Sequence, residues 1–355
     1  MKILKRIKVY KGIRNGLLIK GGLLFLKSKI FKIPVLKYMD IALDYACNMK
    51  CDHCFAVTLK KKKEKLNIQD YKKVADDARN EGCLHFNLQG GEPLLIKNFE
   101  EYINAFSPKK NHISITTNGF LMTPEKINSL KISGVKQIIF SLDNMSPEIH
   151  DKFRGLQGSF KKVIESIKYV KEAGLGVSVN VTVSHNSLNQ NDDQKKLFEW
   201  LHSEKIPYNP ILACPVGAWE DKMDLLVTKS DTDYIENLRN TIGLAQRDIH
   251  ASWVKTGCGA VAEQLYLTPY GDVMPCPFIH LSLGNVKEKS ISEIWKNSIS
   301  SGIFGHYSEK CWVAENIEFV KELNEICKQH KNDLPVPNHC EDSINFYKKH
   351  WGSLK

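Results

Sequence analysis

The 355-residue sequence lacks any uncharged apolar run that approaches the 18 or more residues of a membrane-spanning helix, so we expect no such helix. It also lacks the regular cysteine spacing of a secreted disulfide framework, because its 10 Cys are scattered irregularly and three of them share one short segment. Both absences favour a protein of the reducing cytoplasm.

Acidic residues are absent from residues 1–39, which carry 11 Lys or Arg. The chain has 50 basic residues, so the remainder of the chain carries 39 of them together with all 40 Asp and Glu. The net charge of +10 therefore comes from residues 1–39. The body of the protein has no basic excess, which excludes nucleic-acid binding as its function. Residues 1–36 have two interpretations, a peripheral contact with an anionic membrane surface or a helix that covers one end of the fold.

Cys47, Cys51 and Cys54 stand at C-x3-C-x2-C spacing on one short loop. Four thiolates normally hold a [4Fe–4S] cluster, so three leave one iron open for another ligand, which is a catalytic arrangement. An electron carrier of the ferredoxin type is a poor fit to such an open site. A non-catalytic zinc-binding protein is the alternative from another class, although structural zinc sites usually show C-x2-C pairs and four protein ligands.

The segment around these cysteines resembles the cluster loop of the radical S-adenosylmethionine (radical SAM) superfamily. The loop follows the apolar run 39–46 and has a ring-bearing residue, His53, before its last cysteine. A turn of the sequence Gly90-Gly91-Glu92-Pro93 follows about 35 residues later. In that family this turn receives the amino group of SAM, which suits glycines that let the backbone approach and a carboxylate that pairs with an ammonium.

The resemblance also implies further cofactor contacts at the carboxyl ends of strands, where active sites of β/α barrels lie. The residues that it implies as cofactor-binding are His53, Gly90, Gly91, Glu92, Pro93, Asn118, Ser141, Asp143 and Asn180. The cofactors implied are SAM and the [4Fe–4S] cluster on Cys47, Cys51 and Cys54.

The middle of the chain alternates strand-like and helix-like segments, which predicts an α/β fold with a parallel sheet. The predicted strands are 40–46, 84–88, 112–116, 137–141, 176–183 and 208–213, and the predicted helices are 67–81, 97–107, 123–132, 159–173 and 191–204. Six strands match the partial (β/α)6 TIM-like barrel of the radical SAM family. We expect a basic segment at 1–36, this barrel at 37–235 and a small α+β domain at 236–355.

The last third of the sequence predicts a β-hairpin that turns at Pro269 to Asp272, with Cys258 and Cys276 near its open end. The spacing of Cys258, Gly271 and Cys276 resembles the first half of the SPASM/twitch domain, which carries auxiliary iron–sulfur clusters in many radical SAM enzymes. The dense C-x2-C-x5-C-x3-C that follows in full SPASM domains is missing, so one auxiliary [4Fe–4S] cluster is expected.

Two of Cys311, Cys327 and Cys340 would complete that cluster with Cys258 and Cys276. We favour Cys311 and Cys340, because Cys327 lies in a helical pattern (317–330) where a buried thiol is common. The remaining Cys83 and Cys214 are interpreted as core thiols, and Cys214, at the end of the sixth strand, is placed where it can line the pocket.

The resemblance implies an enzyme that reductively cleaves SAM to a 5′-deoxyadenosyl radical, which takes hydrogen from an unactivated substrate carbon. Peptide or protein modification is the first hypothesis for the substrate. A lipid-linked, sugar or other small-molecule substrate is the alternative. An electron donor such as flavodoxin or ferredoxin is the expected partner.

Overall fold

The computed structural model describes residues 22–24, 34–189, 192–242, 244–245, 257–301 and 308–351. Most of the basic segment at 1–36 lies outside these residues, so both interpretations of it stay predictions. None of the helices in the described ranges is both long and apolar enough to cross a membrane.

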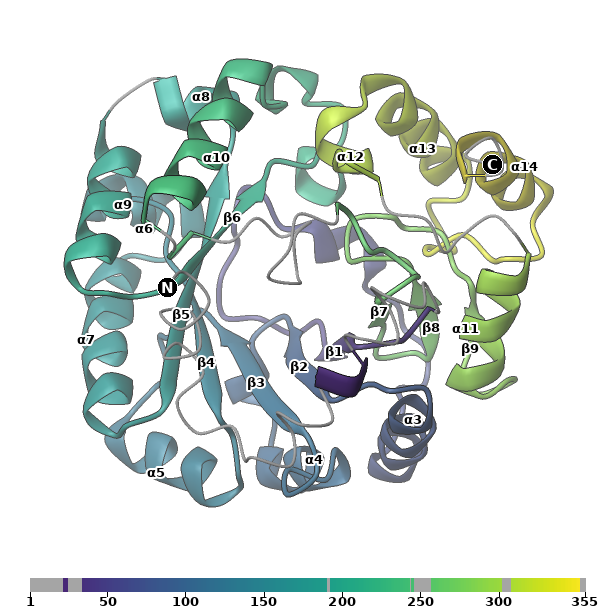
Figure 1. Ribbon diagram of the computed structural model, residues 1–355, viewed down its shortest axis with the longest axis horizontal. Helices are drawn as coiled ribbons and strands as arrows, with labels where there is room; N and C mark the ends of the chain where they lie inside the picture. Colours follow the sequence, from purple (N-terminus) through teal and green to yellow (C-terminus); the bar gives the residue numbers. More distant parts are fainter. Residues whose placement is uncertain are drawn as a thin grey trace.

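Six parallel strands form the main sheet, and they lie side by side in chain order (Figure 1). They are β1 (Tyr38–Asp44), β2 (His85–Gly90), β3 (His112–Thr117), β4 (Gln137–Ser141), β5 (Gly176–Val183) and β6 (Tyr208–Leu212). Each lies within two residues of its predicted bounds, so the partial barrel is confirmed.

Helices cover the outer face of this curved sheet (Figure 1). They are α3 (Ile68–Asn80), α4 (Phe99–Ala105), α5 (Pro124–Ile132), α6 (Pro147–Arg154), α7 (Ser159–Glu172), α8 (His185–Asn189), α9 (Asp193–Ser203) and α10 (Lys229–Ile242). Helix α3 shows why they form: Asn67 caps its first turn in a capping box with Asp70, and its apolar residues, at a spacing of three or four, are buried. Helices α6, α8 and α10 were not among the predicted helices.

The two faces of β1 illustrate how the sheet separates a core from a polar interior. Met39 and Ile41 are fully buried in the hydrophobic core, while Asp40, between them, belongs to a cavity lining. Asp40 Oδ1 accepts a hydrogen bond of 2.8 Å from Asn87 Nδ2, which also donates to Thr116 Oγ1 at 3.0 Å. Polar side chains from three neighbouring strands thus line the inside of the barrel.

The predicted hairpin is confirmed as β7 (Gln264–Leu267) and β8 (Asp272–Met274), followed by β9 (Gly284–Asn285). Strand β7 pairs in parallel with β1, so one sheet of nine strands runs from β6 to β9. The helices of this region are α11 (Ile291–Ser300), α12 (Trp312–Glu315), α13 (Ile317–Gln329) and α14 (Glu341–Trp351). The C-terminal α+β region therefore adds directly to the edge of the barrel sheet.

Candidate active site

The cysteine loop begins at Asp44, the last residue of β1. Its carboxylate accepts hydrogen bonds from the backbone N–H groups of Tyr45 at 2.6 Å and Ala46 at 3.1 Å, and its other oxygen pairs with Lys65 Nζ at 2.6 Å. Burial opposes ionisation of Asp44, but the Lys65 ammonium and the two N–H groups lower its pKa overall. Asp44 therefore stays ionised and holds the start of the loop in a fixed turn.

A cavity of about 390 Å³ opens beside this loop, at the carboxyl ends of the parallel strands. The predicted site residues that line it are Cys47, Cys51, His53, Cys54, Gly90, Gly91, Asn118, Ser141 and Asn180. Three predicted residues, Glu92, Pro93 and Asp143, are buried outside the lining that the described residues form. The structure thus brings most of the predicted site together around one cavity.

Gly90, the last residue of β2, and Gly91, which follows it, lie against the backbone of the cysteine loop. The Gly91 and Glu92 N–H groups donate to the carbonyl oxygens of Asp44 and Ala46, both at 2.8 Å. A Cβ at Gly90 would lie 2.1 Å from the Asp44 oxygen, and one at Gly91 would lie 2.1 Å from the Ala46 oxygen. Any side chain at either position would push the cysteine loop out of place.

The Glu92 carboxylate is buried and accepts three hydrogen bonds from its own chain. The donors are Leu94 N at 3.0 Å, Thr117 Oγ1 at 2.8 Å and Asn118 N at 2.9 Å. Burial raises the pKa of Glu92 to about 6, although these hydrogen bonds act in the opposite direction. In this structure Glu92 orders the end of β3, and its contact with the amino group of SAM stays a prediction.

Asn118 connects the end of β3 to the cysteine loop, since its Nδ2 donates to Asn48 Oδ1 at 2.8 Å. The Nδ2 atom of Asn48 is buried, and no described residue accepts a hydrogen bond from it. A buried donor beside the cluster loop usually has an acceptor, so this atom fits a ligand that brings an oxygen or sulfur acceptor into the site.

Arg154 is a site residue that the sequence analysis missed. Its guanidinium donates to Asp143 Oδ2 from Nε at 2.7 Å and to Cys51 Sγ from Nη1 at 3.9 Å, and it lines the cavity. Burial opposes the charge of Asp143, but Arg154 lowers its pKa, so a buried ion pair sits behind the cysteine loop. Asp143 positions Arg154 in this structure, and its predicted contact with the cofactor stays a prediction.

His53 presents a neutral, flat ring to the cavity. It stacks on Phe153 with ring centroids 4.6 Å apart and an interplanar angle of 12°, and Trp219 lies against it at 5.7 Å. Burial, aided by the charge of Arg154, lowers the pKa of His53 to about 3. The ring therefore offers an aromatic surface, which suits a purine better than an ion.

Ser141, Asn180 and Asn209 stand in register across β4, β5 and β6. Asn209 Nδ2 donates to Asn180 Oδ1 at 3.0 Å, and all three residues line the cavity. Asn209 was not predicted, although it occupies the second position of the sixth strand and is flanked by residues of the opposite face. These three side chains form a polar row that can bind hydroxyl groups.

The loop thiols suit a metal cluster in number and surroundings. Burial raises the pKa of Cys51 to about 11, although Arg154 opposes the shift, and burial also raises the pKa of Cys47. Iron must therefore displace protons to bind here. Three thiols on one loop and a guanidinium beside one of them fit the open [4Fe–4S] site that the sequence predicts.

The C-terminal region supplies one wall of the cavity. Pro277 and Phe278, which follow β8, line it together with Cys214, and the rings of Phe278 and Phe55 lie 5.5 Å apart. Phe55 comes directly after the last loop cysteine. The hairpin region is therefore packed against the cysteine loop, and Cys214 lines the pocket as predicted.

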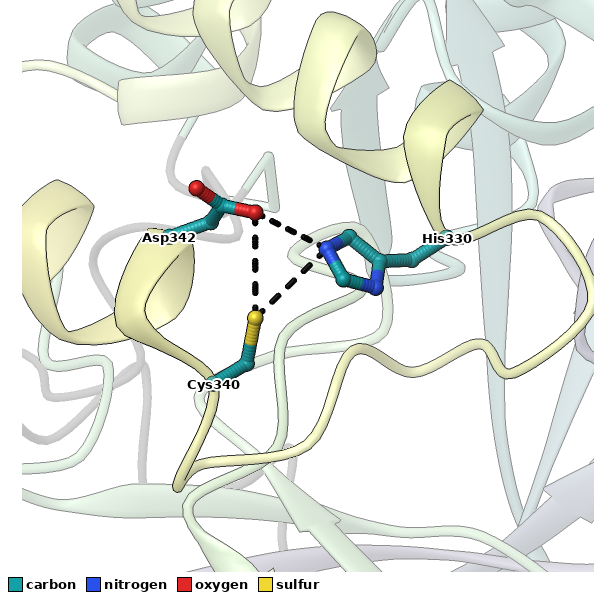
Figure 2. Close-up of side chains that lie close together, drawn as sticks. All are labelled: His330, Cys340 and Asp342. Carbon is teal, nitrogen blue, oxygen red and sulfur yellow. Dashed lines mark hydrogen bonds and ion pairs between the residues drawn. The ribbon is translucent and has the colours of Figure 1, made fainter.

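Cys340, predicted as an auxiliary-cluster ligand, lies in a group with His330 and Asp342 (Figure 2). Its Sγ is 3.5 Å from His330 Nε2 and 3.7 Å from Asp342 Oδ2, and the last two atoms are 2.9 Å apart. These are donor atoms that zinc accepts, but this group of described residues offers three ligands only. The role of Cys340 in an iron–sulfur cluster stays a prediction.

Two family models match this chain. The model of the radical SAM superfamily matches residues 43–201, and the model of the SPASM iron–sulfur cluster-binding domain matches residues 258–331. The first covers the end of β1, the cysteine loop and β2 to β5, and the second covers Cys258, Cys276, Cys311 and Cys327.

Among curated proteins, the antilisterial bacteriocin subtilosin biosynthesis protein AlbA of Bacillus subtilis is 25% identical over 88% of this chain and 68% of its own length. An AdoMet-dependent heme synthase of Methanosarcina barkeri is 26% identical over 71% of this chain and 80% of its own length.

Among solved structures, Streptococcus suis SuiB bound to precursor peptide SuiA has a TM-score of 0.58 at 19% identity, over 76% of this chain and 66% of SuiB. At this identity the likeness describes the fold.

Proposed function

Because the chain belongs to the radical SAM superfamily and carries a SPASM domain, we propose that it is an enzyme that modifies a peptide or protein by radical chemistry. The observation that carries the proposal is the cavity on which three loop thiols, an aromatic histidine and a polar row of strand-end residues converge. This combination fits a cluster with an open iron and a nucleoside beside it.

Cys47, Cys51 and Cys54 would hold the cluster, and SAM would lie along the cavity. When bound, cluster and SAM together supply a 5′-deoxyadenosyl radical that takes hydrogen from an unactivated carbon. Asn48 and Asn118 would orient the amino-acid end of SAM, while His53 would stack on its base. The polar row of Ser141, Asn180 and Asn209 would bind the hydroxyl groups of the ribose. Pro277 and Phe278, which follow the hairpin, would exclude water.

The peptide assignment is supported by AlbA, a relative that aligns over most of this chain and is named for the biosynthesis of a bacteriocin. The heme synthase relative favours the alternative, a small-molecule substrate. The barrel is common to both, so the substrate class has to be decided by experiment.

The first test is SAM cleavage. We expect the anaerobically reconstituted protein to convert SAM to 5′-deoxyadenosine in the presence of dithionite, and Cys51→Ala to abolish the product. Cys83→Ala is the matched control, since Cys83 is fully buried and donates to the His85 carbonyl away from the cavity lining. Equal turnover by Cys51→Ala and the wild type would refute the proposed role of the loop.

A second test assigns the substrate class. Extracts of cells grown in deuterated medium are separated into peptide, lipid and small-molecule fractions, and each is incubated with the enzyme and unlabelled SAM. Deuterium in 5′-deoxyadenosine with the peptide fraction supports peptide modification. Deuterium with the lipid or the small-molecule fraction alone would replace it with the alternative.

Two partners complete the proposal. An acidic electron donor such as flavodoxin or ferredoxin would reduce the cluster, and the exposed Lys60 and Lys62 beside the loop suit its charge.

The basic residues 1–36 would contact an anionic membrane surface. Liposome co-sedimentation with and without these residues tests that contact, and equal sedimentation of the two proteins would exclude it.

A further inference from the structure

Cys214 occupies the junction between the barrel and the C-terminal helices. It lies two residues after the end of β6, is 7% exposed, and lines the cavity. The next residue, Pro215, gives its carbonyl oxygen to Asn324 Nδ2 of α13 at 2.9 Å, in a buried hydrogen bond. The backbone at Cys214 is thus held against an element of the C-terminal region.

The side chain of Cys214 is hydrogen-bonded to that of Cys311, the N-cap residue of α12. The Cys214 thiol also donates to the Leu212 carbonyl oxygen, at 3.3 Å. Two cysteine side chains in contact with one another can bind the same iron–sulfur cluster.

Cys258 and Cys276 complete the group. Cys258 exchanges backbone hydrogen bonds with Ser308, at 2.6 and 3.3 Å, which brings it beside the segment that leads into Cys311. The Cys276 thiol has the thiols of Cys258 and Cys311 as neighbours. Cys311 therefore connects Cys214 on one side with Cys258 and Cys276 on the other.

We propose that Cys214 is the fourth ligand of one auxiliary [4Fe–4S] cluster, together with Cys258, Cys276 and Cys311. This proposal rests on the proposed function. It replaces Cys340 in the predicted ligand set, because the Cys340 thiol lies against the hydrogen-bonded pair of His330 and Asp342 and would have to leave that pair to reach the other cysteines (Figure 2). Cys327 is left out of the set because it lies in α13, where the charged neighbour of its thiol is Glu220.

The assignment gives the auxiliary cluster a place in the reaction site. Since Cys214 lines the cavity, the cluster would form part of the wall that also carries Pro277 and Phe278. It would also bind the end of the barrel sheet to the C-terminal region through a metal centre. A cluster there is close enough to the cavity to exchange an electron with the substrate or to bind it.

Iron content tests the proposal in a chain that cannot form the first cluster. In a Cys47→Ala/Cys51→Ala/Cys54→Ala background, we expect about four irons and four sulfides per chain after anaerobic reconstitution. Adding Cys214→Ala should lower iron to three or fewer and change the EPR spectrum. Adding Cys340→Ala or Cys327→Ala, the matched controls, should leave about four irons and the same spectrum.

Cys214→Ser guards against a folding defect, because serine keeps the size of the side chain and can place oxygen on iron. We expect a folded protein by circular dichroism whose EPR spectrum differs from that of the background. Unchanged iron and spectrum in both Cys214 variants, or loss of iron in Cys340→Ala, would overturn the assignment. Iron near zero in the background itself would also overturn it, while SAM cleavage by the wild type would leave the proposed function standing.

Discussion

Removal of the Arg154 guanidinium should destabilise the protein far more than removal of an ordinary surface charge. Arg154 Nη2 lies 2.6 Å from Asp143 Oδ2, and the two side chains are 8% and 5% exposed. In Arg154→Ala, the Asp143 carboxylate stays buried with the Thr182 N–H, at 2.9 Å, as a remaining donor. A buried charge that loses its partner costs about 3–5 kcal/mol, so we expect that loss in the free energy of unfolding at pH 7.

The assay is urea unfolding of the metal-free chain, followed by circular dichroism. The matched control is Lys229→Ala, which removes an ion pair of 2.8 Å with Asp233 whose side chains are 86% and 62% exposed. Such a pair is worth about 0.3–0.5 kcal/mol. A loss in Arg154→Ala within about 1 kcal/mol of that in Lys229→Ala would refute the reasoning.

The pH dependence gives a second check on the same pair. In the wild type the pKa of Asp143 is lowered, since Arg154 outweighs burial, so the stability from its ionisation is present above the unfolded-state pKa. That stability is lost as pH falls through the lower folded-state value. In Arg154→Ala burial is opposed only by the Thr182 N–H and the nearby His53 and His150, so the pKa of Asp143 rises and the deficit of the variant should shrink in acid. A deficit that stays constant from pH 7 to pH 4 would contradict this account.

Three further predictions concern single residues. Gly91→Ala should abolish SAM cleavage, because its Cβ would lie 2.1 Å from the Ala46 oxygen, whereas Gly174→Ala, with open space around it and a φ of +75°, should retain activity. Asn67→Ala should lower the free energy of unfolding by about 1 kcal/mol through loss of the capping box, measured by urea unfolding. Because burial raises the pKa of Glu92 from 4.5 to about 6, the wild type should lose about 2 kcal/mol relative to Glu92→Gln between pH 4 and pH 7. A relative gain in that interval would contradict the last prediction.

Local sequence patterns were sufficient for the barrel and for most of the cavity lining. Strand periodicity and the glycines of the turn after β2 act over a few residues, so they can be recognised along the chain. The ion pair of Arg154 and Asp143 could not be recognised in the sequence, because it depends on how α6 packs behind the cysteine loop. The same holds for Cys214 and Cys311, which are neighbours only because β6 and α12 meet in space.

The pairing of β1 with β7 has a consequence for the order in which the protein is made. In the folded protein β1 is paired with β2 on one side and with β7 on the other. Its residues, however, leave the ribosome about 220 residues before those of β7. At roughly 5–20 residues per second, one edge of β1 stays uncovered for about 10–45 s of synthesis. An uncovered edge strand is a template for pairing with other chains. The strand that leads into the cysteine loop is therefore the part of the nascent barrel most in need of protection until the C-terminal region arrives.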